Sequence, residues 1–258
     1  MTQSPGTPFH EGTVTTEQHT LVFAEAAPAH PKSTIVSLPG SAGLEMSTAK
    51  DVLAQRHRVV EINPPGWGER NDVTERSHQS TLGPVLAAAI EELVTGPFYL
   101  LGTSMGGANA LYVASLLPDR TQGVILEGSM APVLPPEDMH PMPSPPEDGG
   151  YPLPAPHPRK PWATKDFVMN QMLNRARLFE ITEVDMDAAD AIAKVVEHHI
   201  PVLALLGDAD EILRPSQEKR IRERIPHAQF HLVGGGGHDL QNTAPEIFVE
   251  LVEEFVNS

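Results

Sequence analysis

The stretch LLGTSMGGANALYVASLL, residues 100–117, places Ser104 between glycines in the pattern G-x-S-x-G. The apolar run before the serine predicts a buried strand, and the run after it predicts a helix. A serine on such a strand-to-helix turn is forced into unfavourable backbone angles, and its neighbours must be small. Gly102, Gly106 and Gly107 meet that requirement. The stretch therefore predicts an α/β fold with Ser104 as a candidate nucleophile.

The rest of the chain repeats this alternation of strand and helix. Short β-branched runs alternate with longer helical patterns, which is typical of a mostly parallel sheet covered by helices. Two antiparallel strands are predicted first, within residues 13–26. Buried strands are then predicted at 33–40, 58–66, 98–104, 123–129, 201–208 and 228–235, and helices at 44–56, 81–95, 105–117, 215–225 and 244–256. These elements predict an eight-stranded sheet flanked by helices.

One segment interrupts the alternation. Between residues 132 and 161, 12 of 30 residues are proline, which forbids regular helix and central strand. Residues 166–199 follow with the pattern of two or three helices. Tyr151, Trp162 and the return of core strands favour a cap over a disordered linker. We predict a core formed by residues 1–130 and 200–258, with residues 131–199 inserted as a Pro-rich and helical cap over one end of the sheet.

A serine nucleophile requires a base, and the best candidate is His238. Of the 12 histidines, only this one directly follows a C-terminal strand, in HLVGGGGHDLQ. The four glycines allow the loop to bring the imidazole over the sheet edge. Most of the others, His57 among them, lie in exposed or Pro-rich surroundings and are predicted to be solvated.

The histidine in turn requires an orienting carboxylate at the end of another strand. PVLALLGDADEIL, residues 201–213, offers Asp208, Asp210 and Glu211. Asp208 is expected to hold the turn by bonding its own backbone, and Glu211 is expected to face solvent. Asp210 is therefore the predicted acid, and the order along the chain is Ser104, Asp210, His238.

These motifs, with INPPGWGERND at residues 62–72, resemble the α/β-hydrolase superfamily from about residue 20 onward. The resemblance implies an α/β-hydrolase fold with a small cap and a catalytic triad in the order found here. It also implies an oxyanion hole made by the backbone N–H groups of Ser41 and Met105. The family usually carries His-Gly after its third strand. Here the loop reads SLPGSAG, and Pro39 stands in place of that histidine.

The resemblance implies a serine hydrolase that cleaves a carboxylic ester, thioester or lactone of a small, largely apolar substrate through an acyl-enzyme on Ser104. The alternative is a C–C bond hydrolase, because SMGG and PPGWGERND also resemble the meta-cleavage-product hydrolases. Those enzymes carry an aromatic residue after the catalytic histidine, where this chain has Asp239. A catalytically inactive binding protein on the same fold is the third reading, although no triad member is missing. Trp67, Leu134 and Trp162 are predicted to line the substrate pocket between the strand ends and the cap.

Composition and residue spacing argue against several other kinds of site and partner. The formal net charge of -16 argues against a nucleic-acid partner. The absence of cysteine excludes disulfides, thiolate metal sites and cysteine nucleophiles. The histidines show no metal-ligand spacing, so neither a metal nor a cofactor is expected. Without a signal peptide or an apolar run near 18 residues, we predict a cytoplasmic protein with no membrane partner. The sequence leaves the oligomeric state open.

Overall fold

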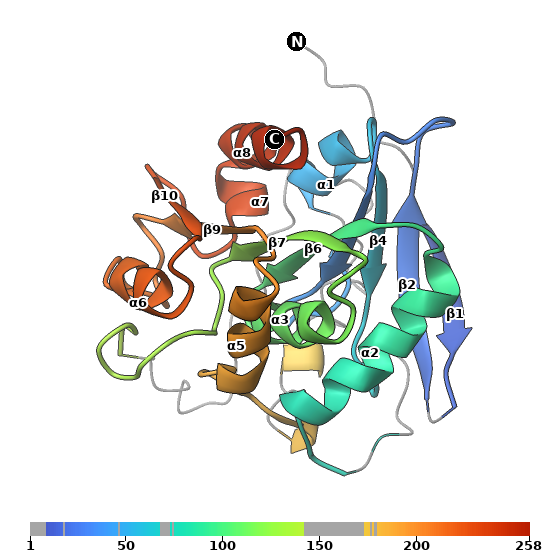
Figure 1. The fold of residues 1–258 in the computed structure, drawn as a ribbon, viewed down its shortest axis with the longest axis horizontal. Coiled ribbons are helices and arrows are strands. Elements are labelled where there is room, and N and C mark those ends of the chain that lie inside the picture. Colours follow the sequence, from blue (N-terminus) through green and yellow to red (C-terminus); the bar gives the residue numbers. More distant parts are fainter. Residues whose placement is uncertain are drawn as a thin grey trace.

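The fold is built on one central sheet of eight strands in the order β1-β2-β4-β3-β6-β7-β9-β10 (Figure 1). The computed structural model describes residues 9–17, 19–45, 47–67, 73, 75–141, 173–175, 177 and 180–258. The strands are β1 (His10–Thr15), β2 (Thr20–Ala26), β3 (Thr34–Leu38), β4 (Arg58–Ile62), β6 (Phe98–Thr103), β7 (Thr121–Glu127), β9 (Val202–Gly207) and β10 (Gln229–Val233). β2 pairs antiparallel with β1 and β4, and all other pairs in this sheet are parallel. The predicted mostly parallel, eight-stranded sheet is confirmed.

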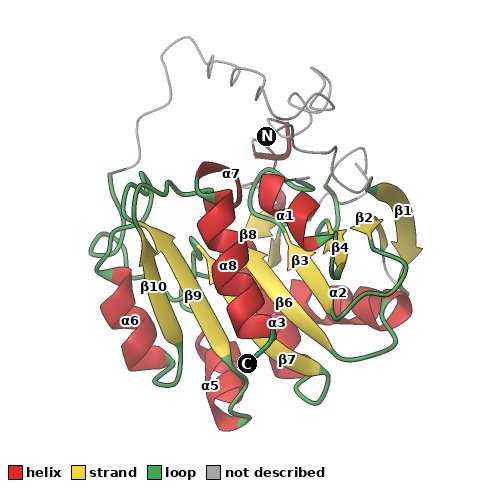
Figure 2. Cartoon of the chain, turned by 90° about the horizontal axis from the view of Figure 1, so that it is seen from above, coloured by secondary structure: helices red, strands yellow, loops and turns green. Residues whose placement is uncertain are grey.

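Helices cover both faces of this sheet (Figures 1 and 2). One layer holds α2 (Gln79–Leu93), α3 (Gly106–Leu116), α5 (Ala189–Glu197) and α6 (Gln217–Arg224), and the other holds α1 (Thr48–Leu53), α7 (Leu240–Thr243) and α8 (Pro245–Val256). Successive strand residues point to opposite faces, so Leu100 packs under the first layer and Leu101 under the second. Both faces are covered, which explains why the inner strands read as continuous apolar runs.

A second, two-stranded sheet was not predicted. β5 (Ser77–His78) pairs in parallel with β8 (Thr182–Glu183). This pair joins the segment before α2 to the C-terminal part of the predicted cap. Two-residue strands carry no periodic pattern, so sequence reasoning has no signal for them.

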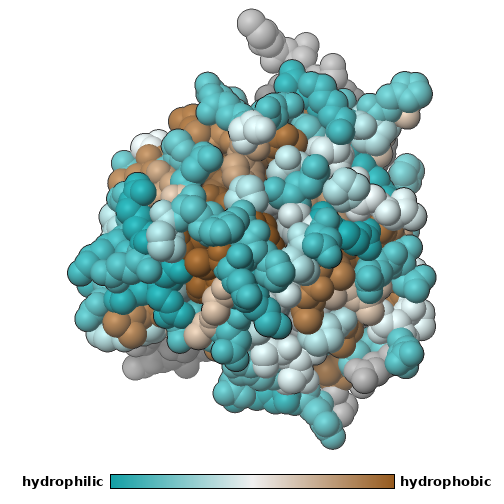
Figure 3. All heavy atoms as spheres, in the orientation of Figure 1, coloured by the Kyte–Doolittle hydropathy of each residue, from teal (hydrophilic) through white to brown (hydrophobic). Residues whose placement is uncertain are grey.

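The division of the chain at residues 131–199 remains a prediction, because residues 142–172 lie outside the described part. Within that range, the described helix α5 packs against α3. Its Ala191, Ile192 and Val195 are buried in the same core cluster as the apolar residues of α3. None of the described helices is long and apolar enough to cross a membrane. On the face seen in Figure 3, hydrophilic side chains cover most of the surface and apolar ones show only in separate patches.

Candidate active site

Ser104 occupies the sharp turn between β6 and α3 with a φ of 53°, in the left-handed region that residues other than glycine rarely adopt. Its N–H donates to the carbonyl oxygen of Glu127 at 2.8 Å. Its own carbonyl oxygen accepts from the N–H of Gly107 at 3.0 Å and from the N–H of Met130 at 2.9 Å. Bonds from both sides therefore hold the strained turn in place.

The glycines around Ser104 are required by close backbone approach. A Cβ atom at Gly106 would lie 2.1 Å from the carbonyl oxygen of Leu38, at the end of β3. A Cβ atom at Gly107 would lie 2.0 Å from the hydroxyl of Ser129. Gly106 thus lets the first turn of α3 lie directly against the end of β3, as the sequence pattern predicts.

The three predicted triad residues lie in one hydrogen-bonded chain. His238 Nε2 lies 3.0 Å from Ser104 Oγ, and His238 Nδ1 lies 2.9 Å from Asp210 Oδ2. The other oxygen of Asp210 accepts from the N–H groups of Ile212 at 2.7 Å and Leu213 at 2.8 Å. These bonds fix the carboxylate, which is 1% exposed as a side chain. With Nδ1–H donating to Asp210, Nε2 is left to accept the proton of Ser104.

The charges around His238 favour its protonated form. Burial of the ring opposes the charge, but the hydrogen bond and charge of Asp210, with the charges of Glu127 and Glu211, raise the pKa of His238 above its ordinary value. Burial likewise opposes ionisation of Asp210, yet His238 and two backbone N–H groups hold the pKa of Asp210 below its usual range. The site can therefore stabilise an imidazolium next to a carboxylate.

The loop predicted to supply the oxyanion hole lies against the nucleophile. The N–H of Gly43 donates to the carbonyl of Gly40 at 3.1 Å, which closes a tight turn around Ser41. A Cβ atom at Gly40 would lie 3.1 Å from Ser104 Cβ. Met105 is the N-cap of α3 and is buried, and the first N–H groups of a helix have no partner within it. The assignment of Ser41 and Met105 remains a prediction that this placement permits.

The model of the Alpha/beta hydrolase family matches residues 35–251 of the chain. The chain belongs to this family. A curated relative is the 2-hydroxy-6-oxononadienedioate/2-hydroxy-6-oxononatrienedioate hydrolase of Cupriavidus pinatubonensis, 26% identical over 80% of this chain and 78% of that protein. A similar hydrolase from Burkholderia vietnamiensis is 26% identical over 78% of this chain and 76% of that protein.

Solved structures show the same fold at low sequence identity. The carboxylesterase CesB of Bacillus subtilis has a TM-score of 0.70 at 15% identity, over 96% of this chain and 92% of that one. The meta-cleavage product hydrolase CumD, solved as a point mutant, has a TM-score of 0.68 at 15% identity, over 95% of this chain and 97% of that one. The protein is thus a hydrolase of the α/β family, and esterases and C–C bond hydrolases share its architecture.

The predicted pocket residues of this hydrolase have different surroundings. Trp67 is 2% exposed and packs with Met105 and Ile181, directly beside the nucleophile turn. Leu134 is 44% exposed, in the loop that follows β7. Trp162 lies outside the described residues. The role of all three in substrate binding stays a prediction. Within the described ranges, no group of three or more His, Asp or Glu side chains is placed to hold a metal ion.

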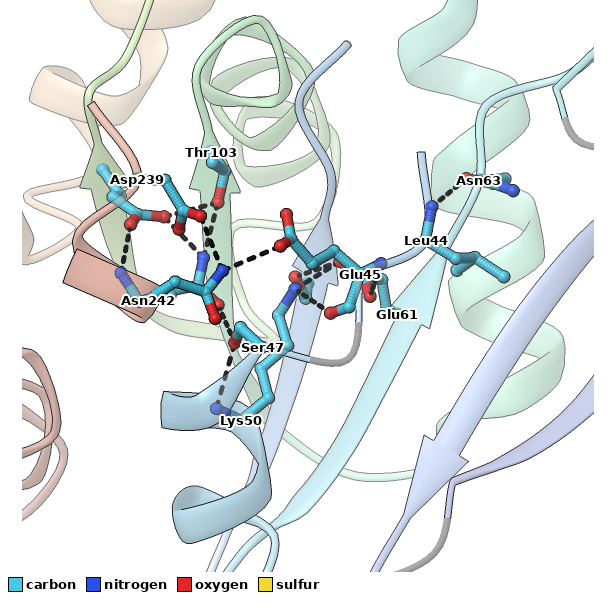
Figure 4. Close-up of polar contacts among 12 residues, drawn as sticks. Leu44, Glu45, Ser47, Lys50, Glu61, Asn63, Thr103, Asp239 and Asn242 are labelled. Atoms are coloured by element: carbon cyan, nitrogen blue, oxygen red, sulfur yellow. Dashed lines mark hydrogen bonds and ion pairs between the residues drawn. The ribbon is translucent and has the colours of Figure 1, made fainter. Parts of the chain in front are cut away.

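Sequence reasoning missed a polar network beside the predicted triad, which Figure 4 shows running from Thr103 and Asp239 to Glu61. The side-chain amide of Gln241 connects its two sides. Its NH₂ group donates to Thr103 and Glu127, and its Oε1 atom accepts from Ser47 Oγ at 2.7 Å. Lys50 then forms a buried ion pair with Glu61. A polar residue at the end of an apolar run, as in GVILEG at 123–128, is the one sequence signal that points to this network.

A second chain of serine, histidine and carboxylate lies at the opposite end of the strands. Ser33 and His57 immediately precede β3 and β4, and Ser33 Oγ lies 2.7 Å from His57 Nδ1. His57 Nε2 lies 3.2 Å from Glu253 Oε1 on α8. The prediction of a solvated His57 is wrong, because this side chain is fully buried. Its Nε2 partner lies on α8, 196 residues away in the sequence.

Proposed function

We propose that this hydrolase cleaves a neutral carboxylic ester, or a related thioester or lactone, through an acyl-enzyme on Ser104. The observation that supports it is the continuous chain Ser104–His238–Asp210, with distances of 3.0 and 2.9 Å. In the first step, His238 Nε2 takes the hydroxyl proton while Ser104 Oγ attacks the substrate carbonyl carbon. The N–H groups of Ser41 and Met105 stabilise the oxyanion of the tetrahedral intermediate.

Collapse of that intermediate transfers the His238 proton to the leaving alcohol or thiol and leaves the acyl group on Ser104. In the second step, His238 removes a proton from water, and the hydroxide attacks the acyl carbon. Collapse then returns the proton to Ser104 and releases the carboxylic acid. Asp210 stays ionised throughout, orients the ring and stabilises the imidazolium formed in both steps.

The charges of the site support a neutral acyl group. The carboxylates of Glu127 and Glu211 act on His238, and that of Asp239 acts on Glu127. An acyl group with its own carboxylate would be repelled in these surroundings. The apolar side chains of Trp67 and Met105, packed beside the nucleophile turn, suit an uncharged substrate instead.

C–C bond hydrolysis is the alternative, because the curated relatives are hydrolases of 2-hydroxy-6-oxononadienedioate. Its substrate would be a vinylogous diketone attacked at the carbonyl carbon. Asp239 and the neighbouring carboxylates are unfavourable to a dicarboxylate of that kind. A binding protein without catalysis is the third outcome that an experiment must distinguish.

The test combines a fluorophosphonate probe with a substrate panel. We expect the probe to label the wild type and the control Ser33→Ala, and to leave Ser104→Ala unlabelled. Ser104→Ala is expected to lose activity by about 10⁴-fold or more. Labelling of Ser104→Ala would contradict the nucleophile assignment. An absence of both labelling and turnover in the wild type would favour the binding protein.

The panel holds p-nitrophenyl acetate and butyrate, an aryl thioester, a lactone and 2-hydroxy-6-oxononadienedioate. We expect the largest kcat/KM for one of the neutral esters or thioesters. A larger kcat/KM for the dienedioate would replace the proposal with C–C bond hydrolysis.

A further inference from the structure

Glu127 is a buried carboxylate that the proposed reaction leaves without a role. It is the last residue of β7, and its side chain is 0% exposed. Its Oε1 accepts from the backbone N–H of Gln241 at 2.9 Å. Its Oε2 accepts from the hydroxyl of Thr103 at 2.7 Å and from the side-chain amide of Gln241 at 2.5 Å. Among the described residues, no Lys or Arg forms an ion pair with it.

These contacts join the two parts of the chain that carry the nucleophile and the base. Thr103 immediately precedes Ser104, and Gln241 follows His238 by three residues at the start of α7. The amide of Gln241 also donates to the Thr103 hydroxyl at 3.0 Å, which closes a small ring of polar groups. The backbone carbonyl of Glu127 accepts from Ser104 N–H at 2.8 Å. Glu127 thus forms hydrogen bonds both to the turn at Ser104 and to the segment that follows His238.

We propose that Glu127 is a positioning residue whose carboxylate joins the end of β6 to the His238 turn and thereby holds the imidazole over Ser104 Oγ. The inference rests on the proposed serine hydrolase function. All three partners of the side chain are donors, so the carboxylate is the group that satisfies them. A glutamine at this position would point an NH₂ group at one of these donors, and a buried donor would lose its acceptor.

The charge of Glu127 adds an electrostatic effect. Burial and the charge of Asp239 raise the pKa of Glu127 to about 7, while the donors from Gln241 and Thr103 oppose the shift. The titratable groups that face it are Asp239 and His238. In its ionised form Glu127 adds to Asp210 and Glu211 in stabilising the imidazolium of His238. Loss of this charge lowers the pKa of His238.

The experiment uses Glu127→Gln in the full chain with p-nitrophenyl butyrate. We expect kcat to fall by about 10-fold or more, because a displaced imidazole loses its alignment with Ser104. KM is expected to change less than about threefold, since Glu127 contacts the triad-bearing turns rather than the substrate. The acid limb of the kcat/KM profile is expected to move to lower pH. A residue that only stabilises the fold would leave that limb where it is.

The matched control is the exchanged pair Glu127→Gln with Gln241→Glu. The exchange reverses donor and acceptor, so the side chains can pair again, and we expect it to recover most of the lost kcat. Failure of the exchange to raise kcat above that of Glu127→Gln would overturn the positioning role. If Glu127→Gln does not fold, Thr103→Val removes a single donor to the carboxylate. We expect Thr103→Val to lower kcat about threefold, and an unchanged kcat would overturn the inference.

The experiments distinguish a failure of the proposed function from a failure of the inference about Glu127. If Ser104→Ala is still labelled by the fluorophosphonate probe, the proposed function fails and this inference fails with it. If Ser104→Ala is unlabelled and inactive, but Glu127→Gln keeps the wild-type kcat and acid limb, only the inference about Glu127 fails.

Discussion

This hydrolase contains two hydrogen-bonded groups of serine, histidine and carboxylate. Their hydrogen-bond distances are similar, but their surroundings differ. Ser104, His238 and Asp210 are joined by distances of 3.0 and 2.9 Å at the carboxyl ends of the strands. Ser33, His57 and Glu253 are joined by 2.7 and 3.2 Å at the amino ends of β3 and β4. Residue types and distances therefore do not by themselves distinguish the two groups.

Three differences separate the two chains. Ser104 sits in a strained turn at the N-terminus of α3 with a positive φ, whereas Ser33, just before β3, does not have a positive φ. The side chain of His238 is 14% exposed, whereas that of His57 is 0% exposed. The acid bonds Nδ1 of His238 but Nε2 of His57. On these grounds we expect Ser104, and not Ser33, to be the reactive serine.

The Ser33 group connects parts of the fold that lie far apart in the sequence. It ties the beginnings of β3 and β4 to α8, and Arg56 adds an exposed ion pair to Glu253 at 3.3 Å. Buried histidines without hydrogen-bond partners are costly, and Ser33 and Glu253 satisfy both ring nitrogens of His57.

The largest expected difference between the two groups is the loss of kcat when the carboxylate is replaced by an amide. Asp210→Asn presents an amide NH₂ to Nδ1 and favours the wrong tautomer of His238, so we expect kcat to fall by on the order of 10⁴-fold. The matched change Glu253→Gln is expected to leave kcat within about twofold of the wild type, because it lies at the other end of the sheet. Steady-state hydrolysis of a p-nitrophenyl ester measures both. A comparable loss in both variants would contradict the distinction between the chains.

A smaller effect is expected in the pH profile. The pKa of His238 is raised, and the neutral ring is the base, so kcat/KM should rise with pH with a midpoint above 6.5. Asp210→Asn removes the strongest of the contributions that raise the pKa of His238, so the residual activity should show its acid limb at lower pH. Ser33→Ala is the control and should keep the wild-type limb. An acid limb that does not move in Asp210→Asn would show that another group controls it.

The smallest expected effect concerns stability. Burial would raise the pKa of Glu253, but the hydrogen bond and charge of His57, with Arg56 and Asn257, hold it below 4.5. A lowered folded pKa means that Glu253 stabilises the fold above pH 4.5, and that this contribution is lost as pH falls through the folded value. We expect Glu253→Gln to lower the free energy of unfolding at pH 7 by about 0.5 to 1 kcal/mol.

Urea unfolding at pH 7, 5 and 3.5 measures this contribution. The difference between the wild type and Glu253→Gln should shrink toward the lowest pH. A difference that stays constant would show that the charge of Glu253 has no part in it.

Most of the sheet was predictable because inner strands that are covered on both faces consist of short apolar runs. The β5–β8 pair was not, since its partners are two residues long and about 100 residues apart. The burial of His57 was not predicted for a related reason, because it also depends on contacts between distant parts of the sequence. Its immediate neighbours Arg56 and Arg58 are charged, whereas the ring is buried and bonds Glu253 on α8, far away in the sequence.

The sequence by itself determined the alternation of strand and helix and the small residues around Ser104, because strand burial and turn sterics act over a few residues. It also predicted Asp210 as the acid and His238 as the base, because both follow predicted strands. Only the tertiary structure decided which polar groups are buried. Glu127 and His57 are buried, and each has a hydrogen-bond partner more than 100 residues away in the sequence; contacts at that separation leave no local pattern in the chain.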